Sequence, residues 1–177
     1  MADGAKLALI VGVGDGLSAC LARKFAAAGM GIGLAARNPE KLAALASETG
    51  ARAYGCDATD AASVAGLFAE VIALQGAPVV VIYNPSTAVR GPIAEVDAGA
   101  VQAALAVTAF GGFLVGQQAA RVMVPRGSGV VILPARRRAS RAMRNQRRLR
   151  WASLRCAGWR RAWRGNCGRW VFMWRMW

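Results

Sequence analysis

Residues 1–134 are predicted to adopt an α/β fold with a doubly wound parallel sheet. Apolar runs of strand length alternate with longer segments of helical periodicity, which is the pattern of parallel strands joined by crossover helices. Two of these runs, residues 7–11 and 79–83, are apolar throughout, as is typical of strands covered by helices on both faces.

The five expected strands cover residues 7–11, 31–36, 51–56, 79–83 and 130–133. A helix should follow the first strand, because Leu17, Leu21 and Phe25 recur every four residues and form one apolar face.

Turn and capping residues mark the next two helices. Pro39 opens a helical segment at its first turn, and Gly50 ends it. Asp60 is expected to cap the following helix, which should stop at Gly76. These boundary residues support the alternation of strands and helices.

The apolar segment 100–116 raises the question of a membrane span. Gln102 and Thr108 interrupt it, and Gln117 and Gln118 follow it, whereas a span needs about 20 mostly apolar residues. We expect a helix buried between the sheet and a partner, with a span as the less favoured alternative. The N-terminus MADGAK has no signal pattern, so a cytoplasmic location is expected.

Residues 135–177 differ from the rest of the chain in composition. They contain fourteen Arg, no Lys, Asp or Glu, and all six Trp, and they carry the whole net charge of +14. We therefore divide the chain into a domain, residues 1–134, and an Arg- and Trp-rich tail, residues 135–177, that is expected to be disordered or poorly folded.

A glycine-rich turn, with Gly12, Gly14 and Gly16, joins the first strand to the first helix. Glycines let the backbone turn tightly and approach a pyrophosphate, which the free N–H groups at a helix start attract. Three glycines alone would equally suit a simple tight turn. The strand before them and the helix after them supply the context of a Rossmann-like dinucleotide site.

The residue at the end of the second strand bears on which cofactor is preferred. A site for NAD(H) usually has a carboxylate there, but this chain has Arg37. A guanidinium binds a 2′-phosphate through charge-assisted hydrogen bonds, so NADP(H) is favoured over NAD(H). A solvated Arg before a helix is the alternative.

Over residues 5–134 the chain resembles the short-chain dehydrogenase/reductase family. VGVGDGLS is similar to the family's TGxxxGIG at Gly12, Gly16 and Leu17, with Val11 in place of Thr and Ser18 in place of the third Gly.

Three further segments carry the resemblance. CDATD is similar to the segment after the family's third strand, which implies that Asp57 contacts the adenine. IYNPS stands in place of the NNAG motif and retains Asn84. AVTAFGGFLVGQQAA resembles the family's long helix, with Thr108 where the family has an Asn of its proton relay.

The resemblance implies hydride transfer between a nicotinamide and a carbonyl or alcohol, with a Ser, a Tyr and a Lys beyond the fifth strand. The Tyr acts as general acid and base, and the Lys favours its ionised form. Neither is present here, because the only tyrosines are Tyr54 and Tyr83 and the last lysine is Lys41. We therefore predict no catalytic residues, and the absence of His and of CxxC pairs predicts no metal site.

The tail has two interpretations. A cationic arm would bind polyanions such as nucleic acid, or an anionic surface, without sequence preference. Alternatively, the reading frame changes near Leu133 or Pro134. If each new codon takes the third base of one codon and the first two of the next, residues 170–177 permit GIHVAHV, similar to a strand of the family. In the same frame WASLRCAGWRRAW, residues 151–163, permits GKFALRGLAQSL, which restores a Lys. The codon four residues before this Lys cannot encode Tyr.

The favoured function is an NADP(H)-binding oxidoreductase of this family, catalytically deficient as written, whose small-molecule substrate is left open. The alternative is a non-enzymatic binding protein with a cationic arm. Because the family's sixth strand is missing, residues 130–133 are expected to form an unpaired apolar edge that favours self-association.

Overall fold

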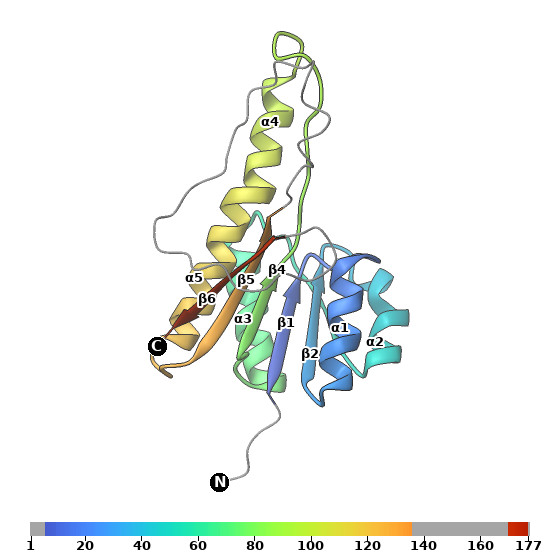
Figure 1. Cartoon of the computed structure of the whole chain (residues 1–177), viewed down its shortest axis with the longest axis vertical. Helices are drawn as coiled ribbons and strands as arrows, with labels where there is room; N and C mark the ends of the chain where they lie inside the picture. The colour runs from blue at the N-terminus through green and yellow to red at the C-terminus, as the bar shows by residue number, and fades with distance from the viewer. Residues whose placement is uncertain (1–5, 136–169, 177) are drawn as a thin grey trace.

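The computed structural model describes residues 6–135 and 170–176, and it describes only the backbone from residue 134 onward. Its sheet has the order β3-β2-β1-β4-β5-β6 (Figure 1). The strands are β1 (Leu7–Val11), β2 (Gly31–Ala36), β3 (Arg52–Gly55), β4 (Val80–Tyr83), β5 (Gly129–Ala135) and β6 (Trp170–Met176). The first five are parallel, which confirms the predicted doubly wound α/β fold.

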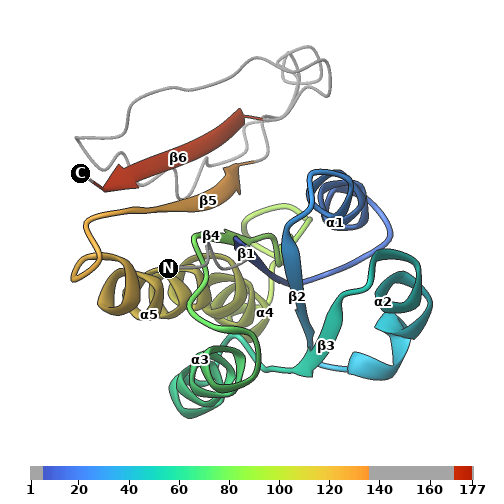
Figure 2. The same ribbon diagram turned by 90° about the horizontal axis from the view of Figure 1, so that it is seen from below.

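Helices cover both faces of this sheet (Figure 2). One face carries α1 (Leu17–Ala27), the 3-10 turn η1 (Pro39–Leu42) and α2 (Ala43–Thr49). The other face carries α3 (Ala61–Gln75) and α5 (Gly111–Met123). The π-helical turn η2 (Ala106–Phe110) joins α5 to the preceding α4 (Ala98–Leu105).

Local sequence signals set the ends of α2 and α3 as predicted. The Asp60 carboxylate accepts hydrogen bonds from the N–H groups of Ala62 and Ser63 at 3.1 and 3.0 Å, which caps α3. Gly50 follows α2 in the left-handed conformation, at a φ of 65°, where other residues would be strained.

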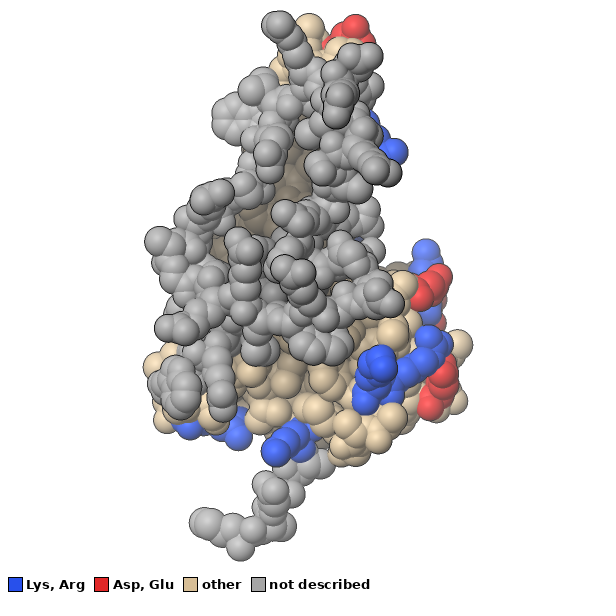
Figure 3. Space-filling view, viewed as in Figure 1, with Lys and Arg blue, Asp and Glu red and all other residues tan. Residues whose placement is uncertain are grey.

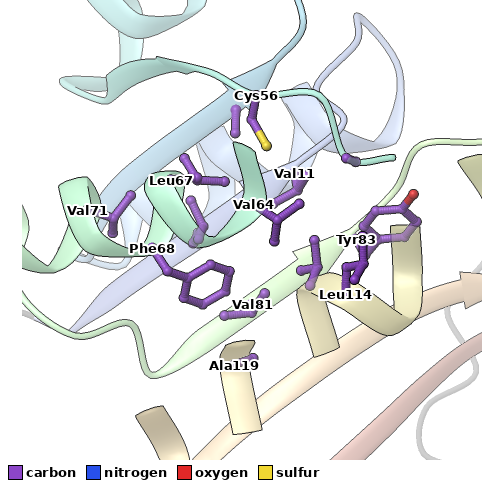
Figure 4. Close-up of a cluster of buried hydrophobic side chains, with 14 of the residues drawn as sticks. Val11, Cys56, Val64, Leu67, Phe68, Val71, Val81, Tyr83, Leu114 and Ala119 are labelled. Atoms are coloured by element: carbon purple, nitrogen blue, oxygen red, sulfur yellow. The ribbon is translucent and has the colours of Figure 1, made fainter. Parts of the chain in front are cut away.

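Two apolar layers hold the helices to the sheet. The larger includes Val11 and Val81 of the sheet, Phe68 of α3 and Leu114 of α5, all buried (Figure 4). The layer on the opposite face is built around Ile10, Leu34 and Ile82, against α1 and α2. Burial on both faces explains why the central strands are apolar at every position.

Charged side chains of the described residues gather over α1 and α2 on the face shown in Figure 3. Arg23 of α1 donates two hydrogen bonds to Glu48 of α2, at 2.6 and 2.8 Å. Both side chains are about half exposed, so this pair contributes little to the free energy of unfolding.

The helical run Ala98–Met123 is long and apolar enough to cross a membrane by length and composition alone. Its second half, α5, buries Leu114, Val115, Ala119 and Met123 against the sheet, as a core helix does. Its first half, α4, buries no residue and extends beyond the sheet (Figure 1). The sheet side of the expectation is confirmed for α5, and the covering of the helix by a partner stays a prediction.

The expectation that residues 130–133 form an unpaired edge is wrong. Throughout its length, from Gly129 to Ala135, β5 pairs antiparallel with β6. An edge strand presents free N–H and C=O groups, and the β-forming segment WVFMWRM supplies matching groups from a distant part of the chain. The tail thus contributes a strand, and the rest of the tail, residues 136–169 and residue 177, lies outside the described residues.

Candidate functional site

The predicted cofactor-binding residues all follow the carboxyl ends of the four strands β1 to β4. Because these strands are parallel, their carboxyl ends meet at one edge of the sheet. This edge carries, in chain order, Gly12, Gly14, Gly16, Leu17, Arg37, Asp57 and Asn84. Ligands bind open α/β sheets outside this edge, near the point where the strand order reverses. Here the reversal lies between β1 and β4.

Gly12 is required where β1 leaves the sheet. Its φ is 80°, and a Cβ at this position would overlap the ring of Pro85. Among the described residues, no atom lies within 4 Å of a Cβ built at Gly14 or Gly16, so these residues leave space beside the outer part of the turn. The inner glycine therefore fixes the turn, and the outer two add no side chain of their own beside its backbone.

The backbone donors of this turn divide into two groups. The N–H groups of Gly12 and Val13 donate to the Ala35 carbonyl at 2.9 and 3.2 Å, which joins the turn to β2. Among the described residues, the N–H groups of residues 14–17 have no backbone acceptor. Gly16 caps α1 without a side-chain hydrogen bond, so these donors are available to an anion.

Ser18 ties the glycine turn to the end of β4, a role that the sequence did not reveal. Its side chain is fully buried, and its Oγ donates to the Gly12 carbonyl at 3.2 Å. The same Oγ accepts a hydrogen bond from Asn84 Nδ2 at 2.7 Å. Asn84 N–H also donates to the Val11 carbonyl at 2.9 Å. Asn84 therefore holds the turn in place through Ser18.

Arg37 and Asp57 lie on adjacent strand ends. Arg37 follows β2 and is exposed. β2 and β3 are still paired directly before Arg37 and Asp57, where the Cys56 N–H donates to the Ala36 carbonyl at 2.9 Å. Asp57 Oδ1 accepts from the Thr59 N–H at 2.9 Å and from Thr59 Oγ1 at 2.8 Å. These bonds, and to a smaller extent Arg37, lower the pKa of the Asp57 carboxyl.

Neither tyrosine of the chain is placed to act as an acid or base. Tyr83 is buried in β4, and its hydroxyl donates to the Val107 carbonyl of η2. Burial raises the pKa of Tyr83 to about 12, so it does not ionise near neutral pH. Tyr54 donates to Gln75 Oε1 at 2.7 Å, and burial raises its pKa as well.

Thr108, at the position of the family's relay Asn, makes a hydrogen bond within its own helical run. Its Oγ1 donates to the Ala104 carbonyl at 2.6 Å, and the residue is exposed in η2. Within residues 6–135 and 170–176, no group of three His, Cys, Asp or Glu side chains could hold a metal ion.

A family model described as short chain dehydrogenase matches residues 6–135. D-threitol dehydrogenase of Mycolicibacterium smegmatis is 29% identical over 143 residues, which cover 78% of this chain and 55% of the relative. (+)-Borneol dehydrogenase 1 of Salvia officinalis is 36% identical over 83 residues, which cover 45% of this chain and 32% of the relative. The chain thus spans about half or less of these curated relatives.

Solved structures give the same result for the fold. A short-chain dehydrogenase from Rhodopseudomonas palustris matches with a TM-score of 0.66 at 29% identity, covering 70% of this chain and 60% of the other. A metagenomic short-chain oxidoreductase in complex with NADP matches with a TM-score of 0.68 at 26% identity, covering 71% and 60%.

Proposed function

Because the chain belongs to the short-chain dehydrogenase family, we propose that residues 1–134 form the NADP(H)-binding half of an oxidoreductase. One observation carries the proposal: the glycine turn, Arg37 and Asp57 lie at a single edge of the sheet. The matched structure with NADP supports it, because that protein has a similar fold.

The described residues fit the chemical parts of a nicotinamide dinucleotide. The free N–H groups of residues 14–17 would bind the pyrophosphate at the start of α1. The open space at Gly14 and Gly16 would let the phosphates approach the backbone closely. Asp57, held ionised by Thr59, would accept a hydrogen bond from the adenine amine.

The preference for NADP(H) over NAD(H) rests on Arg37. In the described part of the chain, the salt bridge found is Arg23–Glu48, so the Arg37 guanidinium has no carboxylate within ion-pair distance. It is exposed at the end of β2 and can make two charge-assisted hydrogen bonds to a 2′-phosphate. NADH lacks this phosphate and would gain nothing from Arg37.

We further propose that the chain binds the cofactor without turning over a substrate. A bound nicotinamide supplies or accepts a hydride, and the protein must then move a proton at the substrate oxygen. Tyr83 and Tyr54 are occupied in structural hydrogen bonds and have raised pKa values. No tyrosine follows Tyr83 and no lysine follows Lys41 in the sequence, so the Tyr and Lys that the family has beyond β5 are both absent.

A change of reading frame near Leu133 accounts for the missing catalytic half. The family match ends at residue 135, close to the point that the codon arithmetic gives. The nucleotide sequence across codons 130–140 distinguishes this origin from a selected cationic arm. Whatever its origin, the Arg-rich tail would bind polyanions, with an affinity that falls as the salt concentration rises.

The cofactor proposal is tested by titrating NADPH and NADH into the full-length chain and following nicotinamide fluorescence. NADPH should bind more tightly. In Arg37→Gln, the loss of a charged hydrogen-bonding group should weaken NADPH binding by about tenfold or more and leave NADH binding nearly unchanged.

Arg52→Gln is the matched control, because Arg52 is exposed at the opposite, amino-terminal end of β3. It should alter neither affinity. Equal affinities of the unmodified chain for NADPH and NADH, or equal effects of the two substitutions, would contradict the role of Arg37. Absence of binding to either dinucleotide would overturn the proposed function itself.

A further inference from the structure

Asp15 places a negative charge within the proposed pyrophosphate turn. It lies between Gly14 and Gly16, and all three residues are exposed. Within the described residues, Asp15 has no salt-bridge partner. Its charge is therefore not neutralised by a cation of the described domain.

Asp15 directly precedes the N-cap of α1. The N-cap is Gly16, which has no side chain, and the first turn of α1 contains no acidic residue. An acid beside the free N–H groups of a helix start is stabilised by their partial positive charge. Asp15 is the one acidic side chain within the glycine turn, residues 12–16.

A bound pyrophosphate would use the N–H donors on either side of Asp15. Among the described residues, the N–H groups of residues 14–17 have no backbone acceptor, and no atom would contact a Cβ at position 14 or 16. The pyrophosphate of a dinucleotide would therefore lie next to a residue of the same sign of charge, and like charges repel each other. Arg37, the cation that we assign to the site, would bind the 2′-phosphate on the adenine ribose and not the pyrophosphate.

We propose that Asp15 is an affinity-determining residue that weakens the binding of both dinucleotides by opposing their shared pyrophosphate. This inference rests on the proposed cofactor site. The effects of Asp15 and Arg37 on binding can be distinguished, because Arg37 changes the ratio of the NADPH affinity to the NADH affinity. Asp15 changes both affinities by the same factor and leaves the ratio unaltered.

The test measures dissociation constants of NADPH and NADH for the full-length chain, Asp15→Asn, Asp15→Glu and the control Glu70→Gln. Glu70 is an exposed acid on α3, so its substitution removes the same charge away from the turn. Asp15→Asn should tighten both cofactors by about three- to tenfold at low ionic strength. Asp15→Glu and Glu70→Gln should resemble the unmodified chain.

The dependence of the affinity on salt concentration distinguishes an effect of the Asp15 charge from an effect of the shape of its side chain. At an ionic strength of about 0.5 M the advantage of Asp15→Asn should fall below about twofold, because screening shortens the reach of the carboxylate. If the unmodified chain binds and Asp15→Asn binds equally well, or if its advantage ignores salt, the inference is overturned and the cofactor site stands. If no variant binds either dinucleotide, both proposals fail.

Discussion

The two halves of the helical run Ala98–Met123 differ in packing although both are apolar. α4 is at least as apolar as α5, yet α4 buries no residue whereas α5 buries six. The reason is position: α5 lies across the sheet, and α4 extends beyond it (Figure 1). Apolar composition therefore indicates that a helix can be buried, but the extent of the neighbouring sheet decides which turns are.

The π turn η2 marks the boundary between these halves. Tyr83 of β4 donates its hydroxyl hydrogen to the Val107 carbonyl there. Gly111 follows directly, and a Cβ at this position would lie 2.6 Å from the Ala58 carbonyl oxygen. The helix thus meets the sheet at a site where only a glycine fits.

The largest effect is expected from a matched pair of substitutions across this boundary. Leu114→Ala removes a side chain that is 7% exposed and should lower the free energy of unfolding by about 2–4 kcal/mol. Leu105→Ala removes one that is 44% exposed and should cost less than about 1 kcal/mol. Urea unfolding followed by circular dichroism measures both. Equal losses would mean that α4 is covered in solution, as by a second copy of the chain.

A second pair compares two glycines of α5. Gly111→Ala should lower the free energy of unfolding by about 1–3 kcal/mol, because the methyl group would overlap Tyr83 and the Ala58 carbonyl. Gly116→Ala should raise it by up to about 1 kcal/mol, because no atom of the described residues lies within 4 Å of the added Cβ and alanine favours a helix. Thermal unfolding of both variants checks the signs. If Gly111→Ala were neutral, the close contact at the boundary would not exist in solution.

The smallest effect is expected for Tyr83→Phe, which removes the hydrogen bond to Val107 and should cost about 1 kcal/mol. The variant should also respond differently to alkali. Folding raises the pKa of Tyr83 from 10.0 to about 12, so its stabilising contribution is complete below pH 10 and is lost as the pH rises toward 12. Stability measured from pH 9 to 12 should therefore fall less in Tyr83→Phe. Identical pH profiles would show that the phenol is accessible to solvent.

The strands and helix ends of the domain could be predicted because their signals are local. The sequence identified β1 and β2 with their observed bounds, Leu7–Val11 and Gly31–Ala36. A capping carboxylate such as Asp60, or a left-handed glycine such as Gly50, acts on backbone groups within a few residues. Such contacts form wherever the chain carries them, so they can be inferred without knowing the fold.

The grouping of the proposed site followed from the same local pattern combined with one topological rule. Once parallel strands are inferred, residues after successive strands must meet at one edge, and Arg37 and Asp57 do so. Their roles toward a cofactor are proposals, which the titrations above test.

Tertiary structure alone decided the contacts between residues that are far apart in the sequence. Ser18 and Asn84 are separated by 66 positions, and no pattern near either residue shows that a buried hydroxyl would join them. β5 and β6 pair across a long intervening segment, which is why β5 was wrongly expected to be an unpaired edge. Composition set which segments were apolar, charged or rich in turn residues, whereas packing set which of them are buried and which partners they find, because burial depends on three-dimensional neighbours.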